Sequence, residues 1–242
     1  MVWTEFLAMT AVTGFLHKIW DRSPELVFDL VRPADIEEVA IFLLKDYFPH
    51  LPLTEITEMS VELEIRPWIG KYLASVVQKN VSVLVRDTSR NKTIVAVCIN
   101  DITYRYSARD DINLFSFTDP VVSPNWTKIC QLVKDLYTDI HFDEDPILSF
   151  NLVGVAPGYS HRGLATKLIQ IIEEIAKGRR IHLMKNEVVN EYLANTYFEA
   201  GYVMAKEIKY EFYGKEGEIP ERSFFTNSIH NSIRLMVKKI AN

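Results

Sequence analysis

The order of apolar and polar positions predicts a chain in which strands and helices alternate. Alternating or short apolar runs predict strands at residues 27–32, 81–86, 93–106, 147–155, 181–185, 203–213 and 233–240. Apolar residues at helical spacing predict helices at residues 33–47, 61–79, 126–137, 166–177 and 191–199. Pro49 and Pro52 predict a loop after the first helix, and Pro67 predicts a kink or a break in the second. This order favours a mixed α/β fold with sequential hairpins and right-handed crossovers.

Two segments lie outside this regular pattern. Residues 107–125 are irregular and contain proline, which predicts an inserted loop. Residues 1–26 are expected to form an N-terminal extension, either a short helix that caps the fold or a lid over a substrate pocket. The remaining residues, 27–242, are expected to form a single domain, since this length suits one large domain.

The composition limits the class of protein. The chain has 242 residues, 48% of them hydrophobic, and a net charge of -5. It therefore lacks the basic stripe of a nucleic-acid-binding protein. Its two cysteines, Cys98 and Cys130, fit a reducing compartment and predict neither a disulfide scaffold nor a metal site. No apolar run approaches the ~18 residues of a membrane span, and the N-terminus lacks the cationic start of a signal peptide. We expect a cytoplasmic protein without a membrane partner, and a monomer is favoured.

One junction between a predicted strand and a predicted helix carries chemistry. Residues 155–168 read VAPGYSHRGLATKL. Loop amides and the positive end of a helix dipole converge at such a junction, which favours an anion there. Gly163 has no Cβ and lets the backbone approach a phosphate closely, and Ala165 keeps that approach open. Neither G-x-x-x-x-G-K-[ST] nor G-x-G-x-x-G occurs, so the spacing is not that of a nucleotide phosphate loop. The alternative is an ordinary strand-to-helix turn.

This loop resembles the acetyl-CoA-binding motif of the GCN5-related N-acetyltransferases, which carry Val-x-Pro, a short basic link and [Gln/Arg]-x-x-Gly-x-[Gly/Ala]. Five of the six positions from Ser160 to Ala165 fit. Ser160 stands where the family has Gln or Arg, and Arg162 supplies a cation in the same loop. The resemblance covers residues 27–240 and is closest to the insect arylalkylamine N-acetyltransferases. It implies an α/β (mixed α+β) fold with a central, mostly antiparallel seven-stranded sheet, splayed between strands 4 and 5 and flanked by helices.

The resemblance also implies that acetyl-CoA is the cosubstrate and lies along residues 152–168. By the anion-site argument, the pyrophosphate would meet the backbone of Arg162, Gly163, Leu164, Ala165 and Thr166, with Ser160 and His161 completing the loop. The pantetheine arm would pair like an extra strand with the edge formed by Leu152, Val153, Gly154 and Val155. Gly154 indicates a bulge or a close backbone approach, and the alternative is a glycine needed for packing. Asn190 and Asn195 are candidates to bind coenzyme amides, or serve as turn or cap residues.

A tyrosine is the candidate for protonating the leaving thiolate. Residues 190–202 resemble the family's second motif, a helix that ends in Tyr-x-x-x-Gly-[Phe/Tyr]. The resemblance implies that Tyr197 lies beside the coenzyme sulfur, where a phenol with a pKa of ~10 can donate a proton. The alternative is an aromatic packing residue.

The general base is not given by the resemblance. Insect arylalkylamine N-acetyltransferases carry a Glu-Pro-Leu motif after the first helix, and its Glu acts as base through water. Leu51 stands at that position here. Nearby candidates are Asp46, His50 and Glu55, of which His50 has a suitable intrinsic pKa. Asn151 cannot be a base but would hold a water, and binding of an already neutral amine would need no strong base.

The acceptor is expected to be a primary amine attacking the thioester directly in a ternary complex. Candidate pocket residues are aromatic and suit a small arylalkylamine: Phe48, Trp68, Tyr72, Phe150 and Tyr210. Each has core packing as its alternative. Two other functions stay open: acylation of a different amine or from a longer acyl-CoA, and binding of acyl-CoA without catalysis. Leu51 and Ser160 favour the non-catalytic function, whereas the Gly163 loop and Tyr197 favour an active enzyme.

Overall fold

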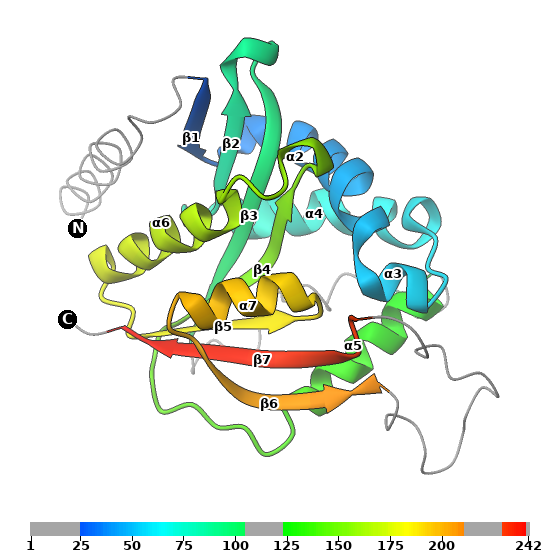
Figure 1. The fold of residues 1–242 in the computed structure, drawn as a ribbon, viewed down its shortest axis with the longest axis vertical. Helices are drawn as coiled ribbons and strands as arrows, with labels where there is room; N and C mark the ends of the chain where they lie inside the picture. The colour runs from blue at the N-terminus through cyan, green and yellow to red at the C-terminus, as the bar shows by residue number, and fades with distance from the viewer. Residues whose placement is uncertain (1–24, 105–122, 211–228, 241–242) are drawn as a thin grey trace.

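The computed structural model describes residues 25–104, 123–210 and 229–240, and Figure 1 shows their arrangement around one seven-stranded sheet. The sheet order is β1-β2-β3-β4-β5-β7-β6. Its strands are β1 (Leu26–Leu30), β2 (Val83–Asp87), β3 (Thr93–Thr103), β4 (Ile147–Val155), β5 (Leu183–Val188), β6 (Val203–Lys209) and β7 (Ser232–Lys239). Only β4 and β5 are parallel, and the other neighbours are antiparallel. The mixed, mostly antiparallel sheet expected from the sequence is confirmed.

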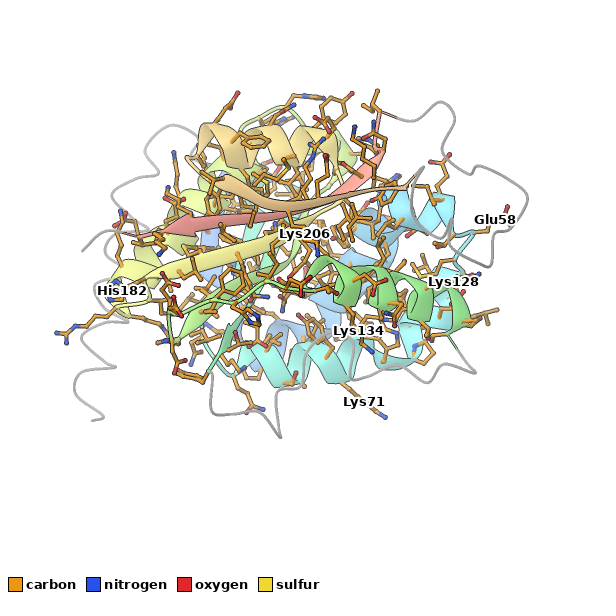
Figure 2. All side chains as sticks on the ribbon, turned by 90° about the horizontal axis from the view of Figure 1, so that it is seen from below. Glu58, Lys71, Lys128, Lys134, His182 and Lys206 are labelled. Atoms are coloured by element: carbon orange, nitrogen blue, oxygen red, sulfur yellow. The ribbon has the colours of Figure 1, made fainter. Side chains whose placement is uncertain are left out.

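Helices cover both faces of this sheet. They are α2 (Ile36–Phe42), α3 (Pro52–Ile56), α4 (Arg66–Val77), α5 (Pro124–Leu136), α6 (Leu164–Gly178) and α7 (Glu191–Glu199). Helices α6 and α7 lie in front of the sheet in Figure 1 and build one apolar core with it, whereas α2, α4 and α5 build a second core on the opposite face. Lys71, Lys128 and Lys134 point outward from α4 and α5 in Figure 2, as expected for the polar sides of amphipathic helices.

The segment after α2 differs from the prediction. The π-helical turn η2 (Leu43–Tyr47), the 3-10 turn η3 (Phe48–His50) and α3 follow one another, so the loop predicted from Pro49 and Pro52 is wrong. Both prolines occupy first-turn positions, where a missing N–H costs no hydrogen bond. At Pro67, where a kink or a break was predicted, the helical run does not break: the π-helical η4 (Val61–Ile65) passes directly into α4 at Arg66, and Pro67 lies in the first turn of α4.

Two predicted segments fall outside what the structure describes. Most of the N-terminal extension, residues 1–24, and most of the inserted loop, residues 105–122, lie outside the described residues. The end of the inserted loop is tied down by Glu64. Its buried carboxylate accepts hydrogen bonds from the backbone N–H groups of Asn125 (2.8 Å) and Trp126 (3.2 Å) at the start of α5.

The sheet opens between β4 and β5. Residues Ile147–Phe150 of β4 pair with Leu183–Asn186 of β5, and no pairing joins the rest of the two strands. A register shift in the β3–β4 ladder leaves Asn151 as an extra residue, next to the point where the strands part. A bulge bends a strand and increases its local twist, which accounts for the divergence. The expected splay is therefore confirmed, but the bulge lies at Asn151 and not at Gly154.

Candidate active site

The opened part of β4 offers backbone groups to a ligand. The Ala156 N–H donates to the Val95 carbonyl of β3 at 2.8 Å. Because backbone groups alternate in direction along a strand, the N–H and C=O groups of Val153 and Val155 point away from β3, toward the open edge. Those of Leu152 and Gly154 belong to the β3 ladder. Val153 and Val155, two of the four residues expected to face a pantetheine arm, thus present their backbone groups to the open edge.

Gly154 has a packing role. A Cβ at this position would lie 3.0 Å from Tyr47 Cδ2 and 3.3 Å from Phe42 Cε1. Because Gly154 has no side chain, the helical segment that ends at Tyr47 can lie directly on β4. The group that closely approaches the Gly154 backbone is therefore the Tyr47 side chain. The alternative of a glycine needed for packing is the one that the structure supports.

The loop that follows β4 leads directly into the N-terminus of α6. The first helical hydrogen bond runs from the Lys167 N–H to the Gly163 carbonyl, at 3.0 Å, so the amides of Leu164, Ala165 and Thr166 precede it. The N-cap residue of this helix supplies no side-chain cap. Gly163 is the N-cap residue, with a φ of 72° and no atom within 4 Å of where its Cβ would stand. These amides are therefore left without a helical hydrogen bond, as the predicted anion site requires.

The remaining loop residues surround this site. Ser160, His161 and Arg162 are exposed. His161 has a φ of 61°, in the left-handed region, which is uncommon for a residue other than glycine. The Arg162 guanidinium lies 4.7 Å from the centre of the Tyr159 ring and donates to the Gly158 carbonyl at 3.2 Å. A cation is thus held close to the exposed amides.

Tyr197 of α7 is buried on the same face of the sheet as α6. Its ring centre lies 5.5 Å from Phe150 and 4.8 Å from Tyr202. Its hydroxyl makes no hydrogen bond of standard geometry to the described residues, although Asn186 lies beside it. Burial, with a smaller contribution from Cys98, raises the pKa of Tyr197 well above its usual value. The phenol is therefore protonated and has a proton to donate.

This geometry is that of a known fold. A sheet that opens between β4 and a parallel β5, with an uncapped helix beginning where the open edge ends, is what the sequence resemblance predicts. The chain has the fold of the GCN5-related N-acetyltransferases. Solved structures with this fold match it over most of its length, although no protein-family model and no curated protein sequence matches it.

Three of these structures show the range of the likeness. Arylalkylamine N-acetyltransferase 2 from Aedes aegypti has a TM-score of 0.72 and 22% identity, covering 89% of this chain and 99% of that chain. The Drosophila melanogaster polyamine N-acetyltransferase, which forms N-acetylagmatine, has a TM-score of 0.66 and 18% identity, with 89% and 100% covered. The NatC complex bound to a Gag peptide and CoA has a TM-score of 0.52 and 11% identity, with 90% and 99% covered. At these identities the likeness establishes the N-acetyltransferase fold.

The residues predicted to bind coenzyme amides differ in their surroundings. Asn190 is the N-cap of α7, and its side-chain oxygen accepts from the Leu193 N–H at 3.2 Å. Its alternative role as a cap residue is thus observed. Asn195 is exposed on α7, with no such bond among the described contacts. Asn195 is the better candidate of the two for a ligand contact.

The candidate bases lie on the short helical segments after α2. His50 and Glu55 are exposed, and Asp46 is half-buried. Glu55 lies close enough to His230, just before β7, to affect its pKa. Burial lowers the pKa of His230, and the negative charges of Glu191 and Glu55 oppose that shift.

His230 is a residue that sequence reasoning missed. Its Nδ1 accepts from the Glu191 N–H, the first amide of α7, at 3.1 Å. An accepting Nδ1 carries no proton, so a neutral ring has its proton on Nε2. His230 follows a polar stretch without periodicity, so no sequence pattern indicated that it would reach α7.

A polar cluster beside the splay was also missed. Asn151, the bulge residue, donates to the Tyr72 hydroxyl at 2.6 Å, and burial raises the pKa of Tyr72. Lys185 Nζ lies 2.6 Å from the Tyr137 hydroxyl and 3.3 Å from Glu187, to which Tyr137 also donates. The strand at residues 181–185 was predicted to end before Glu187, so these side chains were not placed together.

The predicted aromatic residues divide between the two faces. Phe48, Trp68 and Tyr72 are buried in the core of α2, α4 and α5, with ring centres 6.4 Å apart for Phe48–Trp68 and 6.3 Å for Trp68–Tyr72. Tyr210 belongs to the same core. Phe150 belongs to the other core, against Tyr197. The structure therefore does not bring all five together.

Two further observations concern a membrane and a metal ion. Within residues 25–104, 123–210 and 229–240, no helix combines the length and apolarity needed to cross a membrane. In the same part of the chain, no group of three or more His, Cys, Asp or Glu side chains gathers as metal ligands would.

Proposed function

We propose that this protein is an acetyl-CoA-dependent N-acetyltransferase that acetylates a primary amine by direct attack in a ternary complex. The observation that carries the proposal is the continuity between the open edge of β4 and the uncapped amides of α6. An extended arm with two amides can pair with the open edge of β4, and a pyrophosphate can bind the α6 amides. Acetyl-CoA contains both groups. The CoA-bound structure with this fold supports the choice of donor.

The coenzyme would be held mainly by backbone. Its pyrophosphate accepts from the amides of Gly163, Leu164, Ala165 and Thr166, and the Arg162 guanidinium adds charge nearby. Its pantetheine amides pair with the outward backbone groups of Val153 and Val155. This path leads from the loop to the bulge at Asn151, where β4 and β5 part.

The proposed reaction brings the amine, the thioester and the Tyr197 hydroxyl together where β4 and β5 part. The amine nitrogen attacks the acetyl carbonyl, the carbon–sulfur bond breaks, and the sulfur leaves as a thiolate. Tyr197 gives its proton to that sulfur and recovers one from solvent, while the new amide nitrogen loses a proton to water or a base. A phenol that is buried and short of hydrogen bonds is suited to donate without first breaking a strong bond.

The base is proposed among groups on the segment after α2. His50 and Glu55 lie on η3 and α3, close to the Leu51 position where related enzymes keep a glutamate. Both are exposed, so a bridging water would have to relay the proton. Tyr72 and Asn151 would hold such a water on the face opposite Tyr197.

The acceptor is proposed to be a small arylalkylamine. Support comes from Tyr72, which contacts the bulge residue Asn151 beside the splay, and from the arylalkylamine N-acetyltransferase with the same fold. A second candidate is binding of acyl-CoA without catalysis. Leu51 in place of a glutamate, with His50 and Glu55 both exposed, favours it.

Steady-state kinetics separate the two candidates. Purified protein is incubated with acetyl-CoA and a panel of aryl amines, polyamines and peptides, and thiol release is followed. Turnover with an aryl amine, with initial-rate lines that intersect when both substrates are varied, supports direct attack in a ternary complex. Parallel lines would indicate a covalent intermediate. Acetyl-CoA binding without thiol release for any amine would select the non-catalytic candidate.

A further inference from the structure

The coenzyme loop is anchored to a part of the chain far from it in sequence. The Tyr159 hydroxyl donates to Asp87 Oδ2, at the end of β2. Both side chains are buried, with Asp87 4% and Tyr159 7% exposed. In Figure 1 the segment between β4 and α6 crosses the strands β2 and β3 below their hairpin turn, which brings these residues together.

Asp87 is fixed from its other side by the hairpin turn. Its Oδ1 accepts from the Ser89 N–H at 2.8 Å and from Ser89 Oγ at 2.6 Å. Two hydrogen bonds hold the pKa of Asp87 below its usual value. The bond from the Ser89 hydroxyl has the largest effect, and the bond from the Tyr159 hydroxyl has the next largest. The carboxylate is therefore charged at neutral pH and acts as a fixed acceptor for Tyr159.

Tyr159 in turn organises the residues around the anion site. The guanidinium of Arg162 lies 4.7 Å from its ring centre, and that of Arg90, from the hairpin turn, lies at 5.8 Å. His161 and Gly163, on either side of Arg162, both have positive φ angles, of 61° and 72°. A non-glycine residue stays in this region only where its surroundings determine the conformation. The Tyr159 anchor is the buried contact next to this strained segment.

We propose that Asp87 is a positioning residue for the coenzyme, acting through the Tyr159 hydroxyl to fix the loop that presents the α6 amides. This inference rests on the proposed function, because it takes acetyl-CoA as the ligand of those amides. Neither residue is placed in contact with the coenzyme. Their effect is to keep the backbone of residues 160–166 in the conformation that binds, so that binding requires no prior ordering of the loop.

The test removes the hydroxyl and leaves the ring. In Tyr159→Phe, the Kd for acetyl-CoA by calorimetry and the KM are expected to rise about tenfold, since a charge-assisted hydrogen bond is lost. The kcat at saturating acetyl-CoA is expected to stay within about twofold, since the loop does no chemistry. Amide exchange in residues 160–166 is expected to become faster than in the wild type.

A matched control lies in the same hairpin. Ser89→Ala removes the hydroxyl hydrogen bond to Asp87 but leaves both the bond from the Ser89 N–H, which still fixes the carboxylate, and the Tyr159 contact. It is expected to lower thermal stability without changing the Kd or the exchange of residues 160–166. An equal loss of affinity in Ser89→Ala would mean that hairpin stability alone matters, and would overturn the inference.

A double-mutant cycle tests whether Asp87 acts through Tyr159. Asp87→Asn keeps the shape and one oxygen acceptor, and is expected to weaken acetyl-CoA binding no more than Tyr159→Phe does. The double variant is expected to bind like Tyr159→Phe alone, since the second change removes nothing further. Additive losses would contradict the coupling.

The outcomes distinguish this inference from the proposed function. If the wild type binds acetyl-CoA and Tyr159→Phe binds it equally well, the positioning role is wrong and the proposed function stands. If the wild type does not bind acetyl-CoA, the proposed function is wrong and the inference is wrong with it.

Discussion

The ring of Tyr47 packs tightly against the position that a Cβ at Gly154 would take. Cδ2 and Cβ of Tyr47 lie 3.0 Å and 3.4 Å from that position. Tyr47 ends the π-helical turn η2, and Gly154 lies in the opened half of β4. The contact therefore fixes the first helical segment against the strand that would bind the coenzyme.

Adding a methyl group at Gly154 is expected to destabilise the fold. Gly154→Ala should lower the free energy of unfolding by about 1–3 kcal/mol, since the added methyl would lie 3.0 Å from Tyr47 Cδ2 and 3.3 Å from Phe42 Cε1. Denaturant unfolding measures this. Gly70→Ala is the control, because no atom lies within 4 Å of that Cβ position in α4. It should be neutral or stabilise by about 0.5–1 kcal/mol. Equal tolerance of both changes would contradict the contact.

A carboxylate at the α6 N-terminus is expected to abolish acetyl-CoA binding. Gly163→Glu places negative charge at the site proposed for pyrophosphate and strains a residue with a φ of 72°. Calorimetry with acetyl-CoA measures the loss. Gly158→Glu, in the same exposed segment, has open space and no positive φ, and should bind normally. Unchanged affinity in Gly163→Glu would show that the loop is not the coenzyme site.

Removing the buried phenol is expected to slow the chemical step. Tyr197→Phe should lower kcat by about 100-fold or more while the KM for acetyl-CoA changes little, as for loss of a general acid. Steady-state kinetics measure both constants. Tyr202→Phe, in the same aromatic cluster, loses a hydroxyl that donates to Met184 Sδ and interacts with Glu173, and should retain turnover. Normal turnover in Tyr197→Phe would leave Tyr197 as a packing residue.

Stability is expected to fall at alkaline pH. Burial raises the pKa values of Tyr72, Tyr197 and Tyr202. Below pH ~10 both states keep these protons, so the stability is fully present there. Above pH ~10 the unfolded chain loses protons that the folded chain keeps. Each such tyrosine then lowers the free energy of unfolding by up to about 1.4 kcal/mol per pH unit. Denaturant unfolding from pH 8 to 11 tests this, and stability that does not change above pH ~10 would contradict it.

Much of the fold could be predicted from the sequence because periodicity reports which faces are buried. The strand at 147–155 and the helix at 191–199 match β4 and α7, since both have clear patterns and polar or glycine-containing flanks. The segment after Pro49 failed because prolines break helices and also begin them, and only packing decides which. The short helices there form against the core through Phe48 and Leu53.

The candidate site was predictable where it consists of backbone and not where it consists of tertiary contacts. The α6 amides follow from local sequence, through a strand, a glycine and a helix start. The Asp87–Tyr159 bond, the His230–Glu191 bond and the Tyr47–Gly154 contact join residues far apart in the chain. No local pattern encodes such a pairing.

The measurement that tests the central claim most directly is detection of the acetylated product. Wild-type protein is incubated with acetyl-CoA and an aryl amine, and mass spectrometry follows the N-acetyl amine and free CoA. The account predicts that both form in equal amounts with the wild type, and that neither forms with Gly163→Glu at the same acetyl-CoA concentration. Absence of N-acetyl amine with the wild type, for every amine tested and at saturating acetyl-CoA, would contradict the claim that this chain is an N-acetyltransferase.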